Sequence, residues 1–234
     1  NVEKLQVTLD SLVEGHSKAF KIVVFTTGEP QTATTAQNIL HFVRVTPGNL
    51  VDKLNQSAAQ TSCDWLLLAS VGDEFTAGGL LRAGLELMSA TSLRAVATDE
   101  IQRTENGALV DVFRPGFNLD LLQSVPSLMA RHWLIRREAF LEVGGYQADF
   151  NKALEFDLLL RLIEDGGLAG LAHLAEPLLI CNAPVEESSA QERQVLTRSL
   201  AARGYRAQVS SALPLTYQID YQHAARPLVS IIIQ

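Results

Sequence analysis

The chain has 234 residues, 47% of them apolar, and 19 basic against 26 acidic residues give it a formal charge of −7. This composition suits one packed domain, or a domain with an appendage, and excludes a disordered chain. The negative charge argues against nucleic acid as a partner. No run reaches the roughly 18 apolar residues of a membrane span. Cys63 and Cys181 form neither a metal-spaced motif nor a disulfide framework, so we expect a cytoplasmic setting.

Hydrophobic periodicity predicts that helices and strands alternate in the first half of the chain. A helical face that ends at Gly15 precedes a buried strand at residues 20–25. The other elements expected here are strands at 41–45, 65–69 and 93–99 and helices at 49–62 and 76–90. The alternation predicts an α/β fold with a mainly parallel sheet that helices flank on both faces.

The second half is less regular. Residues 106–122 read as a loop-rich excursion, and residues 130–146 as a short strand that enters a helix. An amphipathic helix is expected at 155–167, a strand at 175–183, a polar-surfaced helix at 188–205 and a short extended pair within 207–224.

The last residues, RPLVSIIIQ at 226–234, form an apolar strand that needs a sheet to enter. We therefore divide the chain into a main domain at 1–184, a C-terminal helix and linker at 185–225, and the strand at 226–234. That strand either opens a following domain or folds back as a permuted first strand of this one.

Four local sequences resemble, in order, motifs of family 2 glycosyltransferase domains with the GT-A fold. They are DWLLLASVGDEFTAGGL at 64–80, VATDE at 96–100 with FRPGFNLDLL at 113–122, RHWLIRREAFLEVGGYQADFNKALEFDLLLRL at 131–162, and RPLVSIIIQ at 226–234. The resemblance covers almost the whole chain. It is strongest to tandem-domain bacterial enzymes that build rhamnan, O-antigen or related surface glycans.

The resemblance implies that a sugar passes from a nucleotide-sugar donor to a glycan acceptor with inversion. A carboxylate would remove the acceptor proton, and Mg²⁺ or Mn²⁺ would neutralise the leaving diphosphate. It also implies neighbouring domains of the same longer chain as partners.

The metal corner of the family is altered in this sequence. The positions of its metal-binding acids hold Ser70 and Gly72, and Asp73 remains as a candidate donor and metal ligand. The ordinary alternative for Asp73 is an N-cap of the following helix. A metal-binding histidine of many members corresponds to Cys181, a poor ligand for a hard cation and an ordinary small buried residue.

The other donor-side candidates are polar residues near strand ends. Thr26 and Thr27 stand where the family has an acid that contacts the nucleoside, although a plain turn also explains them. Asn55 corresponds to a polar residue near the nucleotide, with surface solvation as its alternative. Asp99, followed by Glu100, ends a strand and suits either a site or turn capping.

The base of the family corresponds to Glu155, with Asp157 as the acid two residues later. Residues at i and i+2 do not share a helix face. We therefore expect one carboxylate to point into the cleft and the other to stabilise the helix N-terminus.

Acceptor-side candidates come from the third motif. His132 and Arg136, with Arg137, are candidates for a cationic wall, and ordinary surface pairing is the alternative. Trp133 and Tyr146 suit either sugar stacking or the core. The aromatic residue follows the turn glycines Gly144 and Gly145.

Two hypotheses remain open. The acids Glu155 and Asp157 and the Gly-Gly-aromatic turn favour an active transferase with an unusual donor site. Ser70, Gly72 and Cys181 favour a catalytically degenerate module that serves as a scaffold or acceptor platform for a neighbouring transferase domain. A dinucleotide-binding domain is set aside because its glycine fingerprint is missing after the first strand.

Overall fold

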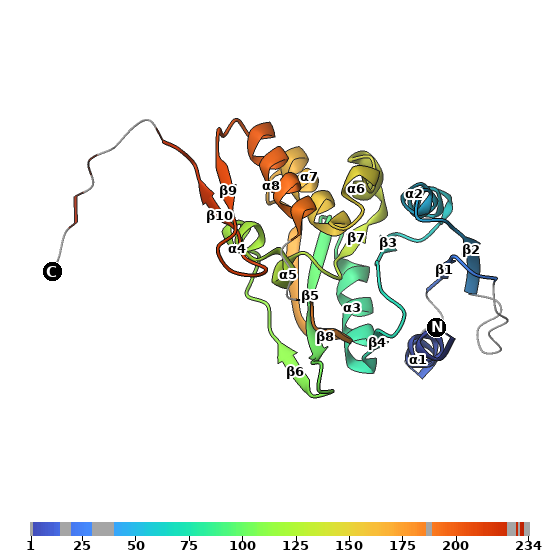
Figure 1. Cartoon of the computed structure of the whole chain (residues 1–234). Coiled ribbons are helices and arrows are strands. Elements are labelled where there is room, and N and C mark those ends of the chain that lie inside the picture. Colours follow the sequence, from blue (N-terminus) through green and yellow to red (C-terminus); the bar gives the residue numbers. More distant parts are fainter. Residues whose placement is uncertain are drawn as a thin grey trace.

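The computed structural model of the chain describes residues 2–14, 20–29, 40–185, 189–223, 228, 230 and 231. Its centre is a six-stranded sheet in the order β3-β7-β5-β8-β4, with β6 added to β5 (Figure 1). The strands are β3 (Trp65–Leu66), β4 (Glu74–Phe75), β5 (Ala95–Arg103), β6 (Leu109–Val112), β7 (Leu134–Arg136) and β8 (Leu171–Asn182). The α/β class expected from the sequence is confirmed.

The strand pairing is mixed, which corrects the expected mainly parallel sheet. Among the described residues of the central sheet only β5 and β8 pair in parallel, and the β3–β7, β5–β7, β5–β6 and β4–β8 pairs are antiparallel. Part of the difference is local, because the turn at Asn106-Gly107 folds the predicted loop into the β5–β6 hairpin. The rest depends on long-range pairing, which the alternation of elements does not specify.

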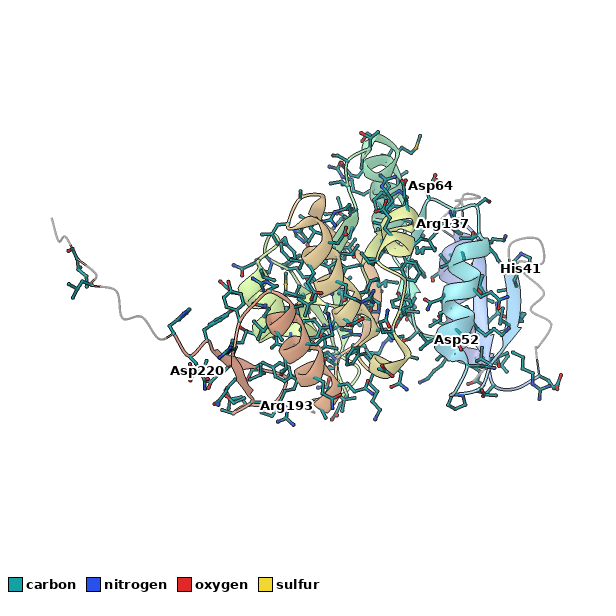
Figure 2. All side chains as sticks on the ribbon, turned by 90° about the horizontal axis from the view of Figure 1, so that it is seen from above. His41, Asp52, Asp64, Arg137, Arg193 and Asp220 are labelled. Atoms are coloured by element: carbon teal, nitrogen blue, oxygen red, sulfur yellow. The ribbon has the colours of Figure 1, made fainter. Side chains whose placement is uncertain are left out.

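A second, two-stranded sheet stands beside the central one. It contains β1 (Ile22–Thr26) and β2 (Leu40–Arg44), paired in parallel from Ile22 opposite Leu40. Among the described residues β1 does not pair with β3. Helices α1 (Val2–Glu14) and α2 (Leu50–Gln60) lie next to this pair at one side of the molecule (Figure 1). Seen from above, His41 and Asp52 mark this outlying layer (Figure 2).

Helices cover both faces of the central sheet because its strands carry apolar side chains on both. Ala95 and Ala97 of β5 pack with α7 (Leu154–Gly166) and α8 (Ala190–Ala202). Val96, between them, packs on the other face with α3 (Ala77–Ser89). The remaining elements are α4 (Leu119–Ser124), α5 (Pro126–Met129), α6 (Arg137–Glu142), the 3₁₀ turn η1 (Ala148–Phe150), β9 (Gln208–Ser210) and β10 (Gln218–Asp220).

The N-cap of α3 shows whether Asp73 caps this helix. Thr76, not Asp73, is its N-cap residue, and the Gly79 N–H donates to the Thr76 hydroxyl oxygen over 3.0 Å. The capping interpretation of Asp73 is therefore wrong. Threonine is an ordinary N-cap residue, so the sequence offered both choices and only the backbone path selected one.

The C-terminal part packs on the main core as far as β10. Val195 and Leu196 of α8 are fully buried, and the Tyr217 N–H donates to the Ser124 carbonyl over 2.8 Å. The expected extended pair is the antiparallel β9–β10 hairpin. Beyond it, Leu228 and Ile231 are 102% and 83% exposed, so at these residues the tail does not fold back into the sheet.

The Gly144-Gly145 turn supplies a matched pair of stability predictions. Both glycines have positive φ, 81° and 69°. A Cβ on Gly144 would meet nothing within 4 Å, whereas one on Gly145 would stand 2.6 Å from Asn55 Oδ1. We expect Gly144→Ala to cost about 1–2 kcal/mol from the left-handed backbone alone. Gly145→Ala should cost clearly more, as measured by urea unfolding; equal losses would mean that the turn relaxes freely.

Candidate functional site

Acidic side chains gather where β5 is irregular. The register between β5 and β8 shifts on both sides of Asp99, and Thr98, Asp99 and Glu100 are all buried. Bulges of this kind re-aim side chains and recur next to active sites. At this bulge Asp99 Oδ1 lies 2.8 Å from His173 Nε2, and Glu100 contacts a different group of residues.

Glu100 is the centre of a buried charge cluster. Its Oε1 pairs with the Arg114 guanidinium and lies 2.9 Å from His132 Nδ1, and its Oε2 lies 3.3 Å from Cys181 Sγ. Burial by itself raises the pKa of Glu100. The hydrogen bond from His132 and the charge of Arg114 outweigh that effect and bring the pKa to about 2.

His132 links this cluster to the altered corner. It has a φ of 54°, a conformation that non-glycine residues adopt rarely. Its Nε2 lies 3.5 Å from Asp73 Oδ2 while Nδ1 faces Glu100. Burial lowers the pKa of His132, but hydrogen bonds with Asp73, Cys181 and Glu100 raise it well above the ordinary value. The protonated imidazole therefore neutralises two carboxylates.

Helix α1 fixes the corner that carries Ser70 and Gly72. The Ser70 N–H donates to Asp73 Oδ2 over 2.7 Å, which ties the acid to its own loop. The Gly72 N–H donates to the Thr8 hydroxyl over 2.9 Å, and the Phe75 N–H donates to the Ser11 hydroxyl over 2.9 Å. The loop is thus held by protein hydrogen bonds.

This donor set does not fit Mg²⁺ or Mn²⁺. Those ions require several free oxygen ligands. Asp73 accepts the Ser70 N–H and faces His132, and of the three clustered groups Glu100, His132 and Cys181 only Glu100 offers oxygen. Cys181, which completes the buried group, offers sulfur. These residues therefore do not supply the oxygen ligands that a hard cation needs.

Glu155 adjoins this charge cluster without forming an ion pair to it among the described residues, and it lines a groove. The groove has a volume of about 780 Å³, and its polar lining includes Ser127, Arg131, Asn151, Lys152 and Glu155. Glu155 is half-buried at the start of α7, and its Oε1 accepts the Trp133 N–H over 3.2 Å. Burial raises the pKa of Glu155, although the His132 charge and backbone N–H groups act in the opposite direction. A carboxylate with this pKa in a groove is suited to accept a proton.

Asp157 points elsewhere, as the i, i+2 spacing predicts. It is fully buried, and its Oδ2 lies 2.7 Å from Arg161 Nη2. Arg198 Nη2 lies 3.3 Å from its Oδ1, an ion-pair distance without hydrogen-bond alignment. Arg161 also donates to the carbonyls of Val143 and Gly145. Asp157 therefore ties α7 to α8 and, through Arg161, to the Gly-Gly turn.

A substitution separates these two carboxylates. We expect Asp157→Asn to lower the free energy of unfolding by about 2 kcal/mol, because it removes the charge that Arg161 and Arg198 share. Ligand binding in the Glu155 groove should persist below the melting transition. Loss of binding by a fully folded variant would show instead that Asp157 acts in the site.

The donor-side candidates are mostly engaged by the protein itself. The Thr26 hydroxyl accepts the Gly28 N–H over 3.2 Å, and Thr27 follows it in the turn after β1. Asn55 exchanges two hydrogen bonds of 2.9 Å with the Tyr146 backbone, so it braces the Gly-Gly turn. Asp99 accepts from the Arg114 N–H and contacts His173. The structure does not gather these residues around the Glu155 groove.

The acceptor-side candidates also separate. Trp133 is buried in the core and donates from Nε1 to the Met129 carbonyl over 2.6 Å. Arg136 lies over the Trp65 ring at 4.5 Å and binds the Leu93 carbonyl. Arg137 binds the Ala58 and Ala59 carbonyls that end α2 (Figure 2). Tyr146 packs edge-on against Phe140. His132 is thus the residue of the proposed cationic wall that joins the charge cluster.

Sequence reasoning missed two arginines. Arg114 stands in the FRPGF motif and is almost fully buried, and its Nη1 donates to the Arg131 carbonyl. Arg131 Nη2 binds the Asn182 carbonyl, but its Nη1 is a buried donor without a partner among the described residues. The available signal for Arg114 was an arginine directly before a proline, in a chain with buried acids that need a cationic partner. No local pattern marked Arg131.

Comparison with known proteins gives distant relatives. No family model matches the chain. The O-antigen biosynthesis protein RfbC of Myxococcus xanthus is 28% identical over 198 residues, which cover 80% of this chain and 15% of that protein. An uncharacterized protein, y4gI, of Sinorhizobium fredii is 28% identical over 153 residues, covering 60% and 17%. The chain thus spans less than a fifth of the length of these relatives.

Solved structures share its architecture. S. aureus TarS 1–349 in complex with UDP-GlcNAc has a TM-score of 0.61 at 12% identity, covering 85% of this chain and 62% of that one. Glucosyl-3-phosphoglycerate synthase from Mycobacterium tuberculosis, in complex with Mn²⁺ and UDP-glucose, has a TM-score of 0.50 at 15% identity, covering 92% and 82%. These likenesses show that the chain has the GT-A glycosyltransferase fold, as its four motifs indicated.

No described helix is long and apolar enough to cross a bilayer.

Proposed function

We propose that this chain is a glycosyltransferase domain that moves a sugar from a nucleotide-sugar donor to a hydroxyl group of a glycan acceptor, with inversion. The observation that carries the proposal is Glu155, a carboxylate with a raised pKa in a polar groove of about 780 Å³. The relatives support it, because one is an O-antigen biosynthesis protein and two structures of the same fold hold UDP-sugars.

The groove has the size and charge that such a reaction needs. Its volume falls within the range of small-molecule sites, about 300–1,000 Å³. Lys152 and Arg131 bring positive charge beside Glu155, and the free Nη1 donor of Arg131 suits a phosphate oxygen. We assign the donor diphosphate to Arg131 and Lys152, and the acceptor hydroxyl to Glu155.

The proposed reaction is a single displacement. Glu155 accepts the proton of the acceptor hydroxyl while that oxygen bonds to the anomeric carbon. The bond from the anomeric carbon to the diphosphate oxygen breaks, and the nucleoside diphosphate leaves with the electron pair. Attack opposite the leaving group inverts the anomeric configuration. Arg131 and Lys152 stabilise the charge that develops on the diphosphate.

A second candidate function has its own supporting observation. The corner at Ser70 and Gly72 lacks the family's acids, and the acids nearby are neutralised by His132 and Arg114. A module of this kind would hold an acceptor glycan, or a neighbouring transferase domain of the same chain, without turnover. In either case we propose a role in surface-polysaccharide synthesis in the cytoplasm.

Calorimetric titration separates the two functions. UDP, GDP and dTDP would be titrated into the folded chain, with Mn²⁺ and with EDTA, and into its Glu155→Ala variant. Binding of one nucleotide, followed by transfer from the matching sugar nucleotide, would support the transferase. Absence of binding to all three by protein with a cooperative melting transition would reject it and favour the module.

Arg131 gives a sharper prediction within the same assay. We expect Arg131→Ala to weaken nucleotide binding about 10- to 100-fold, because it removes a charged donor from the groove. Arg137→Ala is the matched control, since Arg137 serves the end of α2 and should leave affinity unchanged. Equal affinity of Arg131→Ala and the unmodified chain would remove Arg131 from the donor site.

A further inference from the structure

Three buried side chains with different donor atoms converge beside the groove. Glu100 comes from β5, His132 from the turn before β7, and Cys181 from β8. Their ligand atoms all lie within 4.8 Å of one another. His132 Nδ1 is 2.9 Å from Glu100 Oε1, and Cys181 Sγ is 3.3 Å from Glu100 Oε2.

A second layer of contacts orients these three groups. With Nδ1 facing the cluster, His132 presents Nε2 to Asp73 Oδ2 over 3.5 Å. Glu100 is held by Arg114 and by Gln102 Nε2, which is 3.2 Å from Oε2. A histidine whose other ring nitrogen meets a carboxylate is the usual supporting arrangement of a metal-binding imidazole.

The three donors together favour a borderline-soft cation. Thiolate, imidazole and a single carboxylate suit Zn²⁺, whereas Mg²⁺ prefers an all-oxygen shell. We propose that Glu100, His132 and Cys181 bind one Zn²⁺, with water in the fourth position. The proposal does not depend on sugar transfer.

Cobalt substitution tests this site. The chain would be produced in minimal medium with Co²⁺, so that the ion can enter during folding, and its metal content and absorption spectrum measured. We expect one equivalent of Co²⁺ with a thiolate-to-cobalt charge-transfer band. Cys181→Ser should abolish the band and weaken binding by about 100-fold or more. Cys63→Ser, which alters the other cysteine, should change neither.

Several results would overturn the proposal. These are no bound Co²⁺, bound Co²⁺ without the band, or a band that only Cys63→Ser removes. If Cys181→Ser does not fold, X-ray absorption of the unmodified Zn²⁺-loaded chain decides. One sulfur with nitrogen and oxygen neighbours around zinc supports the site, and a shell of nitrogen and oxygen alone rejects it.

Discussion

Glu155→Gln should lower kcat for sugar transfer about 10²- to 10⁴-fold, because the amide cannot accept the acceptor proton. The substitution keeps the shape of the side chain and the hydrogen bond from the Trp133 N–H. Nucleotide affinity should therefore persist. Steady-state kinetics with the sugar nucleotide identified by titration, together with calorimetry on the same variant, would measure both quantities.

Glu192→Gln is the matched control for this prediction. Glu192 also lines the groove, and burial raises its pKa while the Tyr217 hydroxyl lowers it. Its carboxylate accepts the Tyr217 hydroxyl over 2.7 Å, so we assign it to the packing of the C-terminal hairpin. If Glu192→Gln lost the activity and Glu155→Gln kept it, the base would be misassigned.

The pKa of Glu155 sets the sign of two further effects. It lies above the ordinary 4.5 because of burial, and the base works only as a carboxylate. Activity should thus fall as pH drops through this raised pKa, and Glu155→Gln should lose that limb of the profile. A raised carboxyl pKa means that ionisation costs folding free energy at higher pH. Glu155→Gln should then be at least as stable as the unmodified chain at neutral pH.

Arg114→Met should lower the free energy of unfolding by about 3–5 kcal/mol, the second large effect. The change removes the closest cation from buried Glu100 and leaves the charges of His132 and Arg131 to act on it, and breaking a buried pair costs that much. It also removes the hydrogen bond to the Arg131 carbonyl. Urea unfolding followed by circular dichroism would measure the loss.

Two companion variants show whether the pair is responsible. Adding Glu100→Gln to Arg114→Met should recover part of the loss, because no unpaired carboxylate then remains. Arg82→Met breaks an exposed pair with Glu86 and should change stability by less than about 1 kcal/mol. Additive losses in the double variant would contradict the assigned coupling between Arg114 and Glu100.

The fold class could be predicted from the sequence because it depends on local patterns of residues. The amphipathic stretch at 155–167 becomes α7, and the polar-surfaced helix expected at 188–205 becomes α8. Turn chemistry at Gly144-Gly145 ended α6 as predicted. The strand predicted at 65–69 lies at the right place. Only Trp65–Leu66 form a strand, because they pair with the short β7.

The site was readable only in part. Glu155 and Asp157 were found by resemblance, and their divergence followed from helix geometry. Glu100 was noticed merely as a neighbour of Asp99, since no local rule says that a bulge will bury both. Arg114 joins Glu100 from 14 residues away and Cys181 from 81, separations that no short motif spans.

By itself the sequence determined the class of fold and most of its helices and strands, and it predicted that Ser70 and Gly72 replace acids of the family. Periodicity, caps and turns express interactions within a few residues, so they can be read along the chain. The tertiary structure decided the mixed strand pairing, the positive φ of His132 and the role of Asp73. Those features arise where separate segments meet, and the free energy of burying a charge depends on partners that only the folded chain assembles.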